Sequence, residues 1–414
     1  MKALRWLSLL GPGLITGASD DDPSGIGTYA QAGAQFGSGM TWAMVLTFPL
    51  MACVQIISAR VGRVTGKELA ANLSSVLPRW FLIVLLVALF ATNALNIGAD
   101  LAAMGEAMAL LVPGSAVGYA FAFGLTSGAA IIFVPYSRYV RVLKWLTLVL
   151  LAYVGSVFVV DVPWRTVLHD VLVPPLRMDP AYLQTLVAVL GTTISPYLFF
   201  WQSAQEVEEQ EAAPQDAPLK VAPAQAGRQL RKVRIDTVVG MALSNLVGIF
   251  IMLTTAATLH QAGIRDIESA AQAAQALKPI GGSFASALFA GGIIGTGLLA
   301  IPVLAASCAY ALTGALGLER GLEKKPQAAP AFYGTIALAT AIGILLPVLH
   351  VNAMRALVLT AVVNGVIAVP LLIALMKVAQ STSVMGEFTL GRGLAMAGWT
   401  TTALMTLAAF GLLL

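Results

Sequence analysis

Long hydrophobic stretches separated by short polar ones run along the whole chain. A helix that crosses a bilayer needs about 20 mostly apolar residues. Eleven stretches are long enough, and none alternates with the two-residue period of a barrel strand. The predicted spans are 8–35, 40–59, 80–111, 115–134, 145–161, 181–204, 236–259, 283–318, 331–349, 356–376 and 394–414. Because only helices and closed barrels satisfy their backbones in lipid, we expect an all-α membrane protein.

Two of these spans are interrupted. The first contains Gly-Pro-Gly at residues 11–13 and then Pro23, and the sixth contains Pro196. Proline removes a backbone donor and clashes with the preceding turn, so both helices should break inside the membrane. Breaks in spans one and six predict two five-helix repeats of opposite topology, about 8–161 and 181–376, with an extra helix at 394–414.

The composition agrees with a single membrane domain over 1–414. The chain is 58% hydrophobic and 11% charged, whereas a soluble domain carries about 25% charged residues. The longest polar stretch, 205–234, is acidic at first, then rich in Pro and Ala, then basic. We expect a partly disordered cytoplasmic linker here, because Pro214, Pro218 and Pro223 argue against one continuous helix.

The basic residues predict the orientation. With the amino terminus in the cytoplasm, all but five of the 24 Lys and Arg residues lie in inner loops, as the positive-inside rule requires. The five exceptions are Arg165, Arg177, Arg265, Lys278 and Arg355. The net charge of +4 therefore needs no nucleic-acid partner. We expect a monomer in the lipid bilayer of the cell (inner or plasma) membrane.

The first break carries three consecutive carboxylates, Asp20, Asp21 and Asp22. A charge at this depth costs at least ~2.5–3.5 kcal/mol, so it normally faces a cavity or a partner. Together with carbonyl oxygens freed by the break, the carboxylates suit a hard divalent cation such as Mg²⁺, Ca²⁺ or Mn²⁺. Asp22, directly before Pro23, is the best candidate. The alternative for all three is to cap a half-helix or to bond to a neighbouring span.

Several motifs occur in a specific order along the chain. They are Gly-Pro-Gly at 11–13, Asp-Pro-Ser-Gly at 22–25, Gln-Ala-Gly-Ala-Gln-Phe-Gly at 31–37, Val-Thr-Gly at 64–66, Asp-Leu-Ala at 100–102, Asp236, Arg-Ala-Leu-Val-Leu at 355–359 and Met-Gly-Glu-Phe at 385–388. In this order the chain resembles the NRAMP divalent-metal transporters over essentially its whole length. The resemblance implies a LeuT-type fold and no enzymatic activity.

Departures from the family pattern concern the ion. NRAMP transporters carry Asp-Pro-Gly-Asn in span one, where this chain has Ser24 and Gly25 in the last two places. Their Met-Pro-His in span six is Ser195, Pro196 and Tyr197 here. Loss of the soft thioether and of the amide predicts a roomier, oxygen-only site. The pattern resembles the NRAMP-related magnesium transporter branch, which implies transport of Mg²⁺ and also Mn²⁺.

The resemblance also implies a set of ligands. The ion would contact the side chain of Asp22 and, directly or through water, Ser195. The carbonyl groups of Ser19 and Thr192 match backbone ligands of the family, and Gly25 would line the space left by the missing amide. The divalent cation is a transported substrate, and no cofactor is expected.

Proton coupling should be weak or absent. By the same resemblance, the His of span six corresponds to Tyr197, a Glu of span three to Ala103 and a Gln of span ten to Ala361, although Asp100 is kept. Two alternatives remain. One is a proton-coupled Mn²⁺/Fe²⁺ importer of the ordinary NRAMP type. The other is a LeuT-type organic-solute symporter in which Asp22 pairs with a substrate amine.

Overall fold

The computed structural model describes residues 11–134, 151–349 and 351–412, and their regular secondary structure is helical. The longer helices are α2 (Pro12–Asp20), α3 (Pro23–Phe36), α4 (Thr41–Thr65), α6 (Arg79–Ala109), α7 (Ala116–Phe133), α10 (Trp164–Leu172), α11 (Pro180–Thr193), α12 (Pro196–Ala212), α13 (Ala226–Thr255), α16 (Ala285–Leu316), α17 (Pro330–Leu345), α18 (Ala353–Gln380) and α20 (Arg392–Gly411). The shorter ones are α5 (Leu69–Leu73), α9 (Leu151–Ser156), α14 (Ala270–Gln275), α15 (Lys278–Gly281) and α19 (Thr382–Met385).

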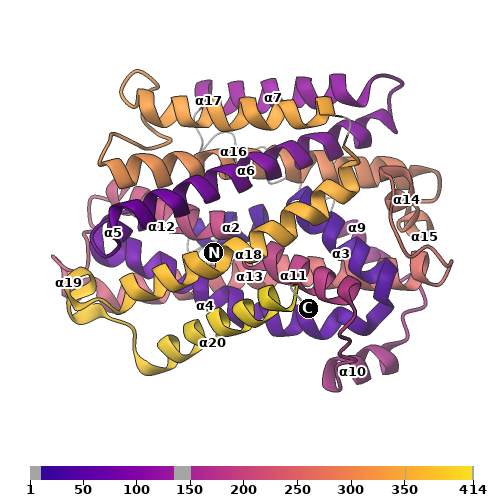
Figure 1. Ribbon diagram of the computed structural model, residues 1–414, viewed down its shortest axis with the longest axis horizontal. Coiled ribbons are helices and arrows are strands. Elements are labelled where there is room, and N and C mark those ends of the chain that lie inside the picture. Colours follow the sequence, from indigo (N-terminus) through magenta and orange to yellow (C-terminus); the bar gives the residue numbers. More distant parts are fainter. Residues whose placement is uncertain (1–10, 135–150, 350, 413–414) are drawn as a thin grey trace, which may run out of the picture.

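The long helices form one bundle, with α7 and α17 along one side and α20 along the opposite side (Figure 1). The short helices lie at the two ends: α5 and α19 at one, and α10, α14 and α15 at the other (Figure 1). The short helices therefore connect the long ones at both ends of the bundle (Figure 1). In the described part of the chain, nine helical stretches are long and apolar enough to cross a membrane, with α3 and α4 counted together and likewise α11 and α12.

Every predicted span except the fifth corresponds to a described helix or broken helix. Most of the fifth, 145–161, falls outside the described residues, and α9 is its described end. Both predicted breaks are present. The first separates α2 from α3, and the second separates α11 from α12.

The predicted linker, 205–234, is more ordered than expected. Its acidic start continues α12 to Ala212 and its basic end belongs to α13, so only 213–225 is outside the long helices. The reason is Arg63 on α4, which is buried and forms ion pairs with Glu206 at 2.5 Å and with Glu209. Backbone amides of the linker also donate to carbonyl groups at the end of α4. The buried guanidinium of Arg63, which is distant in the sequence, therefore holds the acidic stretch in place.

The half-helix α2 packs directly against α13 through glycines. A Cβ atom added to Gly17 would lie 2.3 Å from the carbonyl oxygen of Gly240, and one added to Gly240 would lie 2.1 Å from that of Gly13. Only residues without a side chain allow two helix backbones to approach this closely. The glycines therefore fix the position of α2, the first half of the first broken helix.

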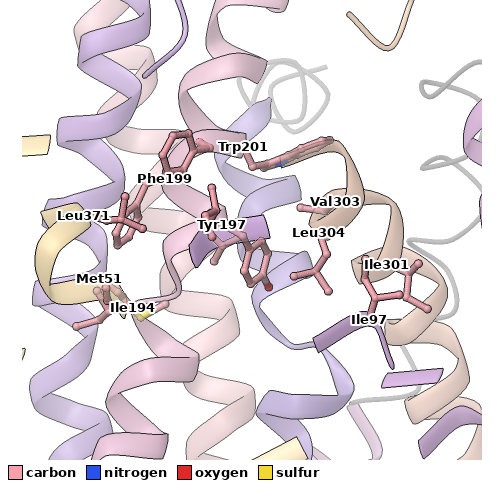
Figure 2. Packing of buried hydrophobic residues seen from close by; sticks show 14 of the residues in the cluster. Met51, Ile97, Ile194, Tyr197, Phe199, Trp201, Ile301, Val303, Leu304 and Leu371 are labelled. Carbon is pink, nitrogen blue, oxygen red and sulfur yellow. The ribbon is translucent and has the colours of Figure 1, made fainter. Parts of the chain in front are cut away.

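The second broken helix is anchored by aromatic packing. Tyr197 and Trp201 on α12 are buried, and the ring of Trp201 meets that of Tyr310 on α16 edge-on, with centroids 6.3 Å apart. Figure 2 shows part of this core, with Ile194, Tyr197 and Phe199 from the second break and Val303 and Leu304 from α16. The second break is thus held rigidly beside α16.

The glycine contact predicts an unusual sensitivity to one methyl group. Gly17→Ala should destabilise the protein by about 1–3 kcal/mol, because the new Cβ has no room against α13. The measurement is thermal unfolding of the purified protein in detergent. Gly334→Ala on α17 is the matched control, because nothing lies within 4 Å of its added Cβ. Equal melting temperatures for the two variants would contradict the close α2–α13 contact.

Candidate functional site

Prolines set the positions of both breaks. Pro23 is the first residue of α3, and Pro196 is the first residue of α12. Proline is favoured at this position because its missing N–H would have no partner inside the helix. Asp22 and Ser195 occupy the residue before each proline in an extended conformation. Each break therefore ends in a polar side chain beside the amino end of a half-helix.

The two breaks lie against each other around Gly25. A Cβ atom added to Gly25 would lie 3.1 Å from the carbonyl oxygen of Asp20 and 3.4 Å from Oδ1 of Asp22. It would also lie 3.2 Å from Oγ1 of Thr192, which belongs to α11. The space beside Gly25 is thus occupied by three oxygen atoms, and the roomier site predicted from the missing amide is not seen in this structure.

Asp22 is buried and accepts two hydrogen bonds. Its Oδ1 accepts from the backbone N–H of Gly25 at 2.6 Å, and its Oδ2 accepts from Nδ2 of Asn96 on α6 at 3.0 Å. Asp22 is therefore the amino-terminal cap of α3, as the alternative interpretation proposed. Among the described residues, no basic side chain forms an ion pair with it. Within the described ranges its charge is therefore met by hydrogen bonds and the amino end of α3, and by no basic side chain.

The other predicted ligands are bonded within the protein. The carbonyl oxygen of Ser19 accepts from the hydroxyl of Tyr197 at 3.0 Å, which joins the two broken helices. The hydroxyl of Ser195 donates to the carbonyl groups of Gly191 and Thr192 at 2.9 and 2.8 Å. Asp22, Gly25 and Thr192 are thus brought together. The Ser195 hydroxyl, at the start of α12, faces the last turn of α11 instead.

Asp20 and Asp21 face another helix. The hydroxyl of Ser244 on α13 lies 2.7 Å from Oδ2 of Asp20 and 3.1 Å from Oδ1 of Asp21. Both carboxylates are buried. The three consecutive aspartates therefore diverge, with two directed to α13 and only Asp22 directed to α6.

Sequence reasoning missed one residue of this site, Asn96. Its bond to Asp22 places it beside the break, whereas in the sequence it resembles any polar residue that joins two helices. The available signal is its spacing of four residues from Asp100, which puts both on one face of α6. In the described ranges, no group of three or more His, Cys, Asp or Glu side chains could hold a metal. A cation here would need mixed oxygen donors.

The amino end of α2 is bound by Asp236 on α13. Its carboxylate accepts from the backbone N–H groups of Gly11 at 2.9 Å, Gly13 at 2.7 Å and Leu14 at 3.2 Å. The first N–H groups of a helix have no partner within it and carry a partial positive charge, so a carboxylate stabilises them. Asp236 thereby fastens the amino end of α2 to α13.

A second connection reaches α2 from α12. The hydroxyl of Thr16 donates to Oε1 of Gln202 at 2.5 Å, and Nε2 of Gln202 donates to Glu206 at 2.9 Å. Glu206 in turn pairs with the buried Arg63. The first broken helix is therefore linked through polar side chains to both α4 and α13.

Comparison with known families gives one match over most of the chain. The family model described as "Natural resistance-associated macrophage protein-like" matches residues 13–414. Among similar proteins, the divalent metal cation transporter MntH of Aeromonas hydrophila is 29% identical over 309 residues, which cover 70% of each chain. The MntH protein of Yersinia enterocolitica is 27% identical over 307 residues, covering 70% of this chain and 69% of its own.

Solved structures agree in fold. A manganese transporter of Eremococcus coleocola matches 98% of this chain and 86% of its own with a TM-score of 0.76 and 16% identity. The nucleobase-cation-symport-1 family transporter MHP1 matches 98% and 90% with a TM-score of 0.55 and 14% identity. The prediction of an all-helical membrane protein with a LeuT-type fold is confirmed.

The contact at Asp236 predicts a measurable change in access. Asp236→Ala should free the amino end of α2 and expose Ser19, which is buried. A thiol introduced as Ser19→Cys should then react with a soluble thiol reagent at least about tenfold faster, since each bond to a charged group is worth roughly 1.5–3 kcal/mol. Asp170→Ala at the opposite end, where Asp170 accepts from Ser38, is the control. Equal rates in both backgrounds would show that Asp236 does not hold α2.

Proposed function

The chain belongs to the Nramp (natural resistance-associated macrophage protein-like) family, and on this premise we propose that it transports divalent metal cations across a membrane by alternating access. One observation carries the proposal. The buried carboxylate of Asp22 lies where the two broken helices meet, without a basic partner in the described part of the chain. A cation is the simplest species to compensate such a charge.

The choice of metal rests on two different arguments. The relatives are named as transporters of divalent metal cations, and the structural neighbour as a manganese transporter. These names favour Mn²⁺, as in the ordinary NRAMP type, over the Mg²⁺ expected from the sequence. The oxygen donors around Gly25 suit Mn²⁺ and Mg²⁺ alike. We therefore propose Mn²⁺ as the primary substrate, with Mg²⁺ as a second candidate supported by the absence of sulfur from the described contacts of Asp22 and Gly25.

Proton coupling is proposed to be weak. The argument is that Tyr197 stands where the resemblance implies a histidine, and its hydroxyl is already bonded to the carbonyl group of Ser19. A phenol does not titrate near neutral pH. The ordinary NRAMP importer is the competing proposal, and it differs in one respect that an experiment can follow, the entry of protons with the metal.

An organic-solute symporter is the candidate from another class. The likeness to MHP1 concerns the fold alone, which unrelated transporters share. Such a symporter would move no Mn²⁺ or Mg²⁺.

Further proposals follow from the charge pattern: a cytoplasmic amino terminus, a cell (inner or plasma) membrane location and a monomeric working unit.

The proposed role of Asp22 predicts loss of transport. Asp22→Ala should abolish Mn²⁺ uptake into liposomes, because the only carboxylate directed at α6 from the break is removed. Glu319→Ala, an exposed acid paired with Lys324, should transport like the wild type. A pH-sensitive dye inside the liposomes should report little acidification during uptake. Strong acidification would favour the proton-coupled importer, and no metal uptake by the wild type would favour the symporter.

The position of Ser195 predicts a change in selectivity. Ser195→Met should raise the affinity for Cd²⁺ relative to Mn²⁺, because a thioether prefers soft metals. Isothermal titration with both ions measures the ratio. Ser307→Met is the matched control, because Ser307 is also buried and bonds to the carbonyl group four residues earlier. An unchanged ratio in Ser195→Met would mean that residue 195 does not approach the ion.

A further inference from the structure

Two polar side chains on one face of α6 leave oxygen atoms without partners. Oδ1 of Asn96 is buried and accepts no hydrogen bond from any described residue, and the carboxylate of Asp100, also buried, has only the backbone N–H of Ser24 beside it. Both residues are 0% exposed. An unpaired buried acceptor costs about 1–3 kcal/mol, and more if it is charged. A ligand on this face of α6 would satisfy the oxygen of Asn96 and could also be shared with Asp100, one helical turn away.

The amide of Asn96 is held at the first break. Its Nδ2 donates to Oδ2 of Asp22 at 3.0 Å, while Oδ1 of Asp22 is occupied by the backbone N–H of Gly25. Because the amide is planar, fixing its nitrogen on Asp22 also restricts where its oxygen can lie. The free oxygen of Asn96 is thus kept within one side chain's reach of the carboxylate that we propose as the main ligand.

A comparison within α6 shows why Asn96 differs from an ordinary packing residue. Asn93, one turn earlier, is also buried and also has an unpaired Oδ1. However, its Nδ2 donates to the carbonyl oxygen of Leu304 at 3.1 Å and to the sulfur of Cys308 at 3.4 Å, both on α16. Asn93 therefore joins two helices. Asn96 joins its helix to a carboxylate that has no basic partner among the described residues.

We propose that Asn96 is a further ligand of the transported cation, binding it through the side-chain oxygen while the amide nitrogen orients Asp22. The inference rests on the proposed function. An amide oxygen is a hard, neutral donor, so it adds a ligand without adding to the negative charge of the three aspartates. It favours Mn²⁺ and Mg²⁺ over the softer Cd²⁺. Asn96 is thus a residue that determines specificity.

The test exchanges the hard donor for a soft one. Asn96→Met and Asn93→Met are purified, and Mn²⁺ and Cd²⁺ binding is measured by isothermal titration. Asn96→Met should bind Mn²⁺ at least about tenfold more weakly and should bind Cd²⁺ more tightly than the wild type. Asn93→Met should keep the wild-type ratio of the two affinities. The same ratio in both variants would overturn the proposal.

A second variant with a smaller side chain is less prone to misfold. It also shows whether Asn96 binds the ion or only orients Asp22. Asn96→Ser leaves room and keeps an oxygen, but one too short to occupy the same place. If Asn96 is a ligand, Mn²⁺ affinity should fall by about tenfold and Cd²⁺ affinity by clearly less. If Asn96 only orients Asp22, both affinities should fall by the same factor, which would overturn the proposal.

The wild type distinguishes this inference from the proposed function. If the wild-type protein binds neither ion, both the proposed function and the role of Asn96 are wrong. If the wild type binds Mn²⁺ and Asp22→Ala does not, but the Asn96 variants bind both ions as the wild type does, only the role of Asn96 is wrong. The role of Asn96 is supported if the Asn96 variants bind Mn²⁺ more weakly and have a changed ratio of Mn²⁺ to Cd²⁺ affinity, while Asn93→Met keeps the wild-type ratio.

Discussion

The cap that Asp22 forms on α3 is the interaction on which the site depends. A carboxylate at the amino end of a half-helix satisfies an exposed N–H group and lies in its favourable field. The same carboxylate accepts from Asn96 on α6, so one side chain fixes both the start of α3 and its distance from α6. Pro23 prevents the preceding helix from continuing through this point, so no backbone carbonyl of a preceding turn can take the place of the Asp22 carboxylate as the hydrogen-bond acceptor. The structural cap and the proposed metal ligand are therefore the same group.

The movable parts are held by different kinds of contact. On α12, aromatic rings packed against α16 hold the second break, and such packing has few alternative arrangements. The half-helix α2 is held by backbone-to-backbone contact at Gly17 and by the carboxylate of Asp236. Each hydrogen bond to the Asp236 carboxylate is worth roughly 1.5–3 kcal/mol, and a moving half-helix would have to replace these bonds by bonds to water. The two breaks are thus held by different contacts, packed rings at the second and backbone and polar contacts at the first.

Local chemistry made much of this structure predictable. Pro23 and Pro196 predict both breaks, and stretches of about 20 apolar residues predict the spans. Both signals are local, because they depend only on residues close together in the sequence. Contacts between segments that are distant in the sequence could not be predicted from it. The order of the acidic linker depends on Arg63, which is 143 residues from Glu206. The filled space at Gly25 and the position of Asn96 depend on how α6 and α11 are rotated, which hydrophobic spans of low amphipathicity do not reveal.

The unpaired oxygens suggest how ion binding and conformation are coupled. Four buried aspartates, Asp20, Asp21, Asp22 and Asp100, gather near the first break, and none forms an ion pair with a described basic residue. A divalent cation bound at Asp22 by mixed oxygen donors would reduce the repulsion between them, although among the described residues no three carboxylates could hold such an ion together. A ligand shifts a conformational equilibrium only by its differential affinity for the two states. For the proposed site this requires that the oxygens of α3, α6 and α11 bind the cation more tightly in one conformation than in the other.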